Sequence, residues 1–206
     1  IDLPGEESGY FYSEAQLNST QGNLETASFG QSFKVTPIQL ITAISASVNG
    51  GYLYEPYVVD KVLDSEGNVV SVTEPTIRRQ VISEETSAEM RDILEGVVEE
   101  GLGSPAAVEG YRVGGKTGTT TNNCDRWFVG FTPYYVAAVW TGYDMPEYMN
   151  FSGNPAAQIW KLVMDPIHKD LPTKSFPTPT IGSPTGIFGN FSGQSQDTGG
   201  DADDAG

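Results

Sequence analysis

The sequence predicts an α+β fold in which helices pack against an antiparallel sheet. Residues 37–48 and 84–100 carry apolar side chains at helical spacing. Three strand-like segments follow at 113–120, 127–131 and 135–143, and the loops between them are too short for a parallel crossover. A further amphipathic helix begins at Asn154 and Pro155. Helices before and after an antiparallel sheet indicate a layered α+β domain.

Composition sets the outer limits on function. The chain has 206 residues, of which 38% are hydrophobic, enough for one domain with a real core. Its net charge of -16 argues against nucleic acid as a partner, because phosphate binding needs a basic surface. No apolar run approaches the ~20 residues of a membrane helix, and no signal peptide opens the chain. The first residue is Ile1 rather than Met, so we expect a fragment or a processed product.

The first predicted helix has a well-defined start and stop. Thr36 and Gln39 form a capping box, and Pro37 suits the first helical position. Asn49 and the two glycines that follow it end the helix. We expect a buried helix whose apolar face is formed by Leu40, Ile41, Ile44 and Val48.

The other two helices are predicted from the same kinds of signal. The second opens at Ser83, with two glutamates in its first turn, where the helix dipole favours anions. Its apolar stripe is predicted to be Met90, Ile93, Leu94 and Val97. The third should be kinked or ended by Pro166. Its buried face is predicted to be Ala156, Ile159, Trp160 and Val163.

The remaining segments have weaker patterns. Residues 1–35 are predicted to form loop and short turns, and residues 52–59 an extended segment. Residues 61–63 and 69–72 should form a β-hairpin around a turn at 64–68, and residues 78–81 a strand or linker. We predict a domain over residues 1–172 and a disordered Gly/Ser/Asp-rich tail over 173–206, because the tail has too little apolar surface to offset its ordering entropy.

Residues 113–120 have the character of a ligand-binding strand. Gly118 has no side chain to hold a ligand away from the backbone. Lys116 and Gly118 should face one way and Thr117 and Thr119 the other, unless twist or a bulge brings the hydroxyls round the edge. An alternative is a polar edge strand whose lysine discourages aggregation.

Several ordered blocks carry a family resemblance. Residues 115–120 (Gly-Lys-Thr-Gly-Thr-Thr), 125–133 and 139–143 resemble the transpeptidase domain of penicillin-binding proteins, and in detail the bifunctional class A peptidoglycan synthases. Residues 1–6, 28–31 and 35–40 fit the same family, so the likeness covers about residues 1 to 170. It implies a partial penicillin-binding transpeptidase fold, similar to serine β-lactamases. It also implies cross-linking of peptidoglycan stem peptides through a serine acyl-enzyme, which β-lactams intercept.

The resemblance also implies roles for the strand. The backbone N–H of Thr119 would be one hydrogen-bond donor to the oxyanion. Lys116 would supply a positive electrostatic field and support the network of proton transfers. The hydroxyls of Thr117 and Thr119 would hold the substrate carboxylate, with Gly118 between them. It implies no cofactor, and an extracytoplasmic location with a membrane anchor and a glycosyltransferase domain upstream of this chain.

The chain departs from the family in one decisive respect. The family's nucleophile lies in a Ser-x-x-Lys motif, and no lysine of this chain has serine three positions before it. Ser-x-Asn occurs at residues 47–49 and 152–154, where Asn49 is better explained as a helix stop and Asn154 as a helix cap. We therefore expect the C-terminal half of the catalytic domain, with the N-terminal half as its partner. The chain alone is predicted neither to react with penicillin nor to transpeptidate.

Other notable residues are interpreted structurally. His168, the single histidine, is expected at the surface or in packing, and nothing has metal-ligand spacing. Trp127 and Trp140 are expected in the core, while Asp125 and Arg126 are expected to be solvated, at the rim of a cleft or paired. Cys124, the single cysteine, excludes an intrachain disulfide and is given no chemistry.

Three alternative functions remain open from the sequence. A serine β-lactamase or β-lactam sensor domain would share the strand, and rapid release of the acyl group would distinguish a β-lactamase. A non-catalytic cell-wall binding or scaffold module would keep the strand without a nucleophile. An acidic cell-surface domain without a ligand would be indifferent to replacement of Lys116.

Overall fold

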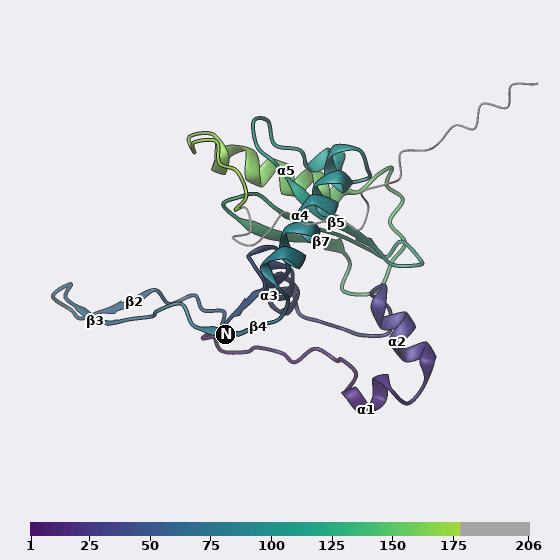
Figure 1. Cartoon of the computed structure of the whole chain (residues 1–206), viewed down its shortest axis with the longest axis horizontal. Coiled ribbons are helices and arrows are strands. Elements are labelled where there is room, and N and C mark those ends of the chain that lie inside the picture. Colours follow the sequence, from purple (N-terminus) through teal and green to yellow (C-terminus); the bar gives the residue numbers. More distant parts are fainter. Residues whose placement is uncertain (178–206) are drawn as a thin grey trace, which may run out of the picture.

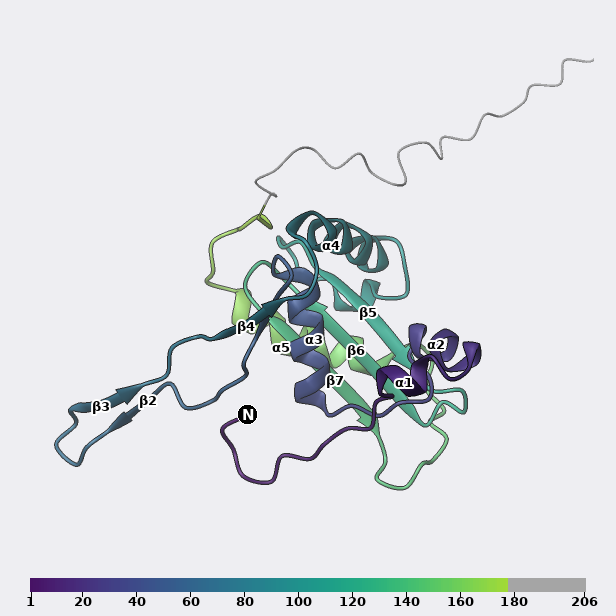
Figure 2. The ribbon, with the colours of Figure 1, turned by 60° about the horizontal axis from the view of Figure 1, so that its bottom comes forward.

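The computed structural model describes residues 1–177 and confirms the α+β fold, with an antiparallel sheet between helices. The sheet has the order β5 (Gly114–Thr119), β6 (Asp125–Phe131) and β7 (Val136–Gly142). Helix α5 (Pro155–His168) covers one face and α3 (Pro37–Val48) lies on the other (Figure 2). Helix α4 (Glu84–Glu99) packs beside β5, and the short helix η1 (Ser104–Ala106) lies between α4 and α5. The predicted tail beyond residue 177 lies outside the described residues.

The core lies between the sheet and α5. Phe128 and Trp160 are fully buried and meet edge to face, with ring centroids 5.6 Å apart. Trp160 also donates from Nε1 to the carbonyl oxygen of Ala137 on β7, at 3.1 Å, which gives its only polar atom a partner. Burial of these two large side chains fixes α5 on the sheet.

The predicted buried face of α5 is only half right. Ala156 and Trp160 are buried, but Ile159 and Val163 are 40% and 48% exposed. The helix is rotated so that Ala157, Met164 and His168 complete its buried face. Pro166 does not end the helix, because it lies in the last turn and its missing N–H would have bonded a carbonyl on the exposed side, at Leu162.

Helix α3 begins as predicted and is less buried than predicted. Thr36 Oγ1 accepts from the N–H of Gln39 at 3.2 Å, and Gln39 Oε1 accepts from the N–H of Thr36 at 2.9 Å. Val48 is buried, whereas Leu40, Ile41 and Ile44 are only partly buried. The expectation of a buried helix therefore holds only for its C-terminal end, where α3 meets α4.

Helix α4 begins after Ser83 as predicted, but its predicted apolar stripe is only partly right, because Met90, Leu94 and Val97 are partly rather than fully buried. Ile93 is 51% exposed, while Arg91 and Glu95 are buried. Arg91 Nη1 donates to the carbonyl oxygen of Val48 at 2.8 Å, and Glu95 Oε2 accepts from Nε of Arg112 at 2.7 Å. Polar side chains with such partners can replace apolar ones in a core. Burial raises the pKa of Glu95, against the opposing effect of Arg112.

The hairpin is confirmed and stands away from the rest of the chain. Strands β2 (Lys61–Leu63) and β3 (Val69–Val72) are antiparallel, and the side chain of Asp64 accepts two turn N–H groups, from Glu66 at 2.9 Å and Asn68 at 2.8 Å. Every residue of both strands is exposed. Figures 1 and 2 both show the hairpin projecting away from the sheet and helices. At its base, β1 (Tyr52–Tyr54) pairs with β4 (Ile77–Gln80), so the predicted strand or linker is a strand.

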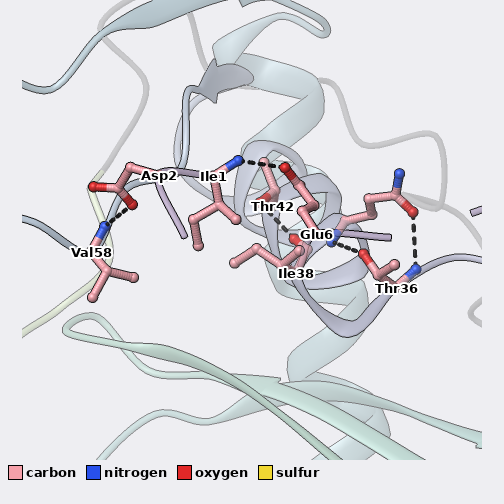
Figure 3. A network of polar contacts seen from close by, with 8 residues as sticks. Ile1, Asp2, Glu6, Thr36, Ile38, Thr42 and Val58 are labelled. Carbon is pink, nitrogen blue, oxygen red and sulfur yellow. Dashed lines mark hydrogen bonds and ion pairs between the residues drawn. The ribbon is translucent and has the colours of Figure 1, made fainter. Parts of the chain in front are cut away.

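The first 35 residues include two short helices, α1 (Glu14–Leu17) and α2 (Gln21–Ser28), rather than loop alone. Neither helix has a buried residue, which explains why no apolar periodicity marks them. The start of the chain is fixed by Asp2, whose carboxylate accepts from the N–H of Val58 at 2.8 Å (Figure 3). It also accepts from the N–H of Val59 at 2.9 Å. These two hydrogen bonds, first that of Val59, lower the pKa of Asp2.

The last described residues return to the body of the domain. His168 is buried, with its ring between Thr132 Oγ1 at 2.8 Å and the carbonyl oxygen of Met164 at 2.9 Å, so of its two predicted roles packing is right and a surface position is wrong. Phe176 contacts the Phe131 ring at 5.5 Å between centroids, and Arg91 donates to the carbonyl oxygen of Pro177. These contacts continue past residue 172, where we placed the end of the domain.

Candidate active site on the open edge of the sheet

Strand β5 forms one edge of the three-stranded sheet, and among residues 1–177 no strand pairs with its other side. Its pairing with β6 runs from Gly114–Phe131 to Thr119–Arg126 without a register shift. Its first two glycines make this possible: a Cβ on Gly115 would lie 2.5 Å from Phe128 Cζ. The glycines therefore let large aromatic side chains of β6 pack across β5 while the pairing stays in register.

Two turns show which backbone groups of β5 reach the open edge. The N–H of Thr120 donates to the backbone carbonyl oxygen of Asp125 at 3.2 Å, and the N–H of Thr132 donates to the backbone carbonyl oxygen of Tyr135 at 2.9 Å. Backbone groups along an antiparallel strand alternate in direction. Because Thr120 bonds toward β6, the backbone groups of Gly118 and Lys116, two and four residues earlier, also bond to β6. The bond of Thr132 agrees with this, because it shows that the even-numbered residues of β6 bond toward β7 instead. The N–H and C=O groups of Thr117 and Thr119 consequently point to the open edge.

The side chains of β5 flank that edge from two sides. Thr117 pairs with Phe128 and Thr119 with Arg126, which places both threonines on the face covered by α5. Lys116 belongs to the other face, but its ammonium returns to the edge and donates to the carbonyl oxygen of Thr117 at 2.8 Å. The predicted alternation is confirmed, because no bulge interrupts it. An extended ligand along this edge would meet backbone groups, an ammonium on one side and hydroxyls on the other.

Gly118 has a packing neighbour as well as an open side. A Cβ at this position would lie 3.2 Å from Trp127 Cβ, a tight contact across the strand pair. Its absence gives the Trp127 side chain room on the same face as Lys116. The glycine thus has a structural role in addition to the close approach that we predict for a ligand.

The two tryptophans beside the site are less buried than predicted. Trp140 is 41% exposed and Trp127 is partly buried, and their rings lie 6.5 Å apart. Trp140 Nε1 donates to Asp125 Oδ1 at 2.9 Å, whereas Arg126 Nη1 donates to the carbonyl oxygen of Gly153 at 2.6 Å. Asp125 and Arg126 therefore do not pair with each other, because neighbouring strand residues point to opposite faces.

The two Ser-x-Asn occurrences have the structural roles expected of them. The Asn49 side chain bonds both the N–H and the carbonyl of Tyr52 in the turn after α3. Asn154 caps α5, with Oδ1 accepting from the N–H of Ala156 at 2.9 Å. Neither asparagine lies on β5.

Sequence reasoning missed Thr120, the residue after β5. Its Oγ1 accepts from the N–H groups of Cys124 at 3.2 Å and Asp125 at 3.0 Å. The signal that could have revealed it is a threonine followed by two asparagines in a short turn, since such side chains bond nearby backbone. Cys124 itself is a half-buried free thiol in this turn.

In the described part of the chain, no helix is both long enough and apolar enough to cross a membrane.

Comparison with known families identifies the domain. Residues 1–165 match the family model described as the penicillin binding protein transpeptidase domain. Stage V sporulation protein D of Bacillus subtilis is 42% identical over 172 residues, and penicillin-binding protein 1A of Clostridium perfringens is 39% identical over 142 residues. The chain therefore belongs to the penicillin-binding protein transpeptidase family. The second name is consistent with the expected likeness to class A members.

The matches cover most of this chain and a small part of each relative. They span 77% of the chain and 26% of the sporulation protein, and 68% of the chain and 17% of the clostridial protein.

Solved structures with the same fold show a similar coverage. The D,D-transpeptidase domain of a peptidoglycan glycosyltransferase from Eggerthella lenta has a TM-score of 0.54 at 29% identity, over 68% of this chain and 34% of that one. Penicillin-binding protein 1A of Haemophilus influenzae has a TM-score of 0.64 at 22% identity, over 83% and 30%.

Proposed function

We propose that this chain forms one wall of the cleft of a D,D-transpeptidase that cross-links peptidoglycan stem peptides. The observation that carries the proposal is the open edge of β5, where the backbone of Thr117 and Thr119 and the ammonium of Lys116 meet. Acyl transfer to and from a peptide needs hydrogen-bond donors for a developing oxyanion and a grip on the substrate. Both are available along this edge.

The reaction that we assign to the complete domain has two steps. The stem peptide ends in D-Ala-D-Ala. A serine oxygen attacks the carbonyl carbon of the penultimate D-Ala, and the bond to the terminal D-Ala nitrogen breaks while that nitrogen takes up a proton. An amine of a stem peptide on a neighbouring peptidoglycan chain then attacks the carbonyl carbon of the acyl-enzyme. The new amide bond forms, the ester bond to serine breaks, and the proton from the amine restores the serine hydroxyl. β-Lactams acylate the serine in the first step, but the second step does not follow, because the leaving nitrogen stays attached to the acyl group.

The residues of β5 have separate tasks in this scheme. The N–H of Thr119 donates to the oxyanion, together with the N–H of the nucleophile. The hydroxyls of Thr117 and Thr119 hold the terminal carboxylate, and a charged acceptor makes such hydrogen bonds stronger. Lys116 adds positive potential and joins the proton network. Gly118 lets the substrate backbone approach the strand.

The nucleophile belongs to a segment that this sequence does not contain, and we assign it to the N-terminal part of the same domain. Two exposed features of the described chain suit such a partner. The outer edge of β7 pairs with no strand among residues 1–177. Helix α5 has an exposed apolar stripe of Ile159, Leu162, Val163 and Ile167. A strand and an amphipathic helix would cover both. We place the complete protein outside the cytoplasm, on the cell-wall side of the membrane, where its substrate lies.

Covalent labelling with a fluorescent penicillin tests the proposal. The full-length protein should be labelled, and Lys116→Ala should lower the labelling rate by about 100-fold, the scale for loss of an electrostatic group in an acyl-transfer site. Lys61→Ala, which removes an exposed strand lysine from β2, is the matched control and should label like the wild type. The 206-residue chain alone should not be labelled.

The same experiment distinguishes the alternatives. Rapid loss of the label would indicate a serine β-lactamase, and absence of labelling in the full-length protein would indicate a binding or scaffold module. Labelling of the isolated chain, or unchanged labelling of Lys116→Ala, would contradict the proposal.

A further inference from the structure

The turn after β5 is built around one hydroxyl group. Thr120 Oγ1 accepts from two backbone N–H groups, those of Cys124 at 3.2 Å and Asp125 at 3.0 Å. The carbonyl oxygen of Thr120 accepts a third, from Asn123 at 2.9 Å, and its N–H donates to Asp125 at 3.2 Å. One residue thus makes four hydrogen bonds across a turn of four residues.

The turn also contains one residue in the left-handed region. Asn123 has φ of 52°, in the left-handed region that residues other than glycine adopt infrequently. Its carbonyl oxygen is held by the N–H of Met149 at 3.1 Å, which ties the turn to the buried Met149. Thr120 and Asn123 therefore fix the two ends of the turn.

From this geometry we propose that Thr120 is a positioning residue, whose hydroxyl holds the N–H of Thr119 in place as an oxyanion donor. Thr119 is the last residue of β5, and its own N–H and C=O point to the open edge rather than into the ladder with β6. Its position therefore depends on its two neighbours. Gly118 is held by pairing with Trp127, and Thr120 is held by the turn. This inference rests on the proposed function of β5.

The physical reason is the precision that an oxyanion donor requires. The donor must be in place before charge develops, because reorganising it during the reaction costs free energy. The Thr120–Asp125 backbone bond, at 3.2 Å, lies at the long end of the normal range. Without the hydroxyl, the N–H groups of Cys124 and Asp125 would lose their side-chain acceptor, and this end of β5 would move more freely.

The test uses the full-length protein and separates noncovalent binding of a penicillin from the acylation step. Thr120→Val keeps the shape of the side chain and removes the acceptor. It should lower the acylation rate constant by about tenfold, less than complete loss of a donor. The dissociation constant of the noncovalent complex should rise by less than that, because the Thr117 hydroxyl still holds the carboxylate. Thr120→Ser keeps the hydroxyl and should stay within about twofold of the wild type. Thr121→Val, at the next exposed position, is the matched control and should have no effect.

Each outcome has a distinct meaning. Equal acylation rates for Thr120→Val and the wild type, with Lys116→Ala impaired, would overturn the role of Thr120 and leave the function of β5 intact. An unimpaired Lys116→Ala would overturn the proposed function itself. A Thr120→Ser variant as slow as Thr120→Val would also overturn the inference, since the methyl group rather than the hydroxyl would matter. If Thr120→Val does not fold, faster amide hydrogen exchange at Gly118, the neighbouring residue whose N–H bonds to β6, is the expected result in Thr120→Ala, and unchanged exchange contradicts the inference.

Discussion

The β5–β6–β7 sheet and the β2–β3 hairpin are both antiparallel and contain β-branched residues in every strand, yet they differ in burial. Phe128 of β6 has no exposed surface, while every residue of β2 and β3 is exposed. The difference lies in what covers them: helices lie on both faces of the sheet, and the hairpin projects away from them (Figures 1 and 2). Strand propensity is thus insufficient to decide whether a strand belongs to a core.

The largest effect should come from removing the side chain that joins the sheet to α5. Trp160→Ala should lower the free energy of unfolding by about 3–5 kcal/mol, because it leaves a large cavity against Phe128. Leu63→Ala in the hairpin should change it by less than about 0.5 kcal/mol, since that side chain is exposed. Urea denaturation measures both. A similar loss for the two variants would show that the hairpin is as well packed as the sheet.

A smaller effect should come from filling the space that sheet glycines leave. A Cβ at Gly130 would lie 2.5 Å from Phe128 Cε1 and 2.8 Å from Trp160 Cε2, so Gly130→Ala should destabilise the domain by about 1–3 kcal/mol. Gly96→Ala in α4 meets no neighbour and should stabilise it, by up to about 1 kcal/mol. Thermal unfolding compares the two. Equal tolerance of both substitutions would contradict the close packing of β6 on α5.

The smallest effect is local and depends on pH. The N–H groups of Val59 and Val58 lower the folded-state pKa of Asp2, so its contribution is present above the ordinary carboxyl pKa of about 3.9 and is lost as pH falls through the lower folded value. Amide hydrogen exchange of Val58 and Val59 should therefore differ between wild type and Asp2→Ala at pH 6 to 7, about three units above that pKa. Identical protection in the two proteins would show that Asp2 does not hold this segment.

The sequence predicted the elements more reliably than the faces that they bury. Thr36, Gln39 and Ser83 mark helix starts through local hydrogen bonds, which are visible in a few residues of sequence. The buried positions Arg91 and Glu95 were missed, because their burial depends on Val48 and Arg112, which lie in other segments. A hydrophobic pattern cannot show where such partners will lie.

Some features of the candidate site could likewise be predicted from the sequence, and others required the structure. The strand and its alternation follow from the residues around Lys116, and the family blocks add the roles that we propose for it. The open edge, the direction of the Thr119 N–H and the support from Thr120 required the strand pairing and the turn, which are tertiary features.

The central claim is that an acyl donor lies along the open edge of β5. The most direct measurement is a structure of the complete domain after reaction with a β-lactam. We predict that the acyl carbonyl oxygen accepts a hydrogen bond from the N–H of Thr119, with the ligand carboxylate at the hydroxyls of Thr117 and Thr119. A β-lactam bound covalently elsewhere, with no contact to residues 116–119, would contradict this account.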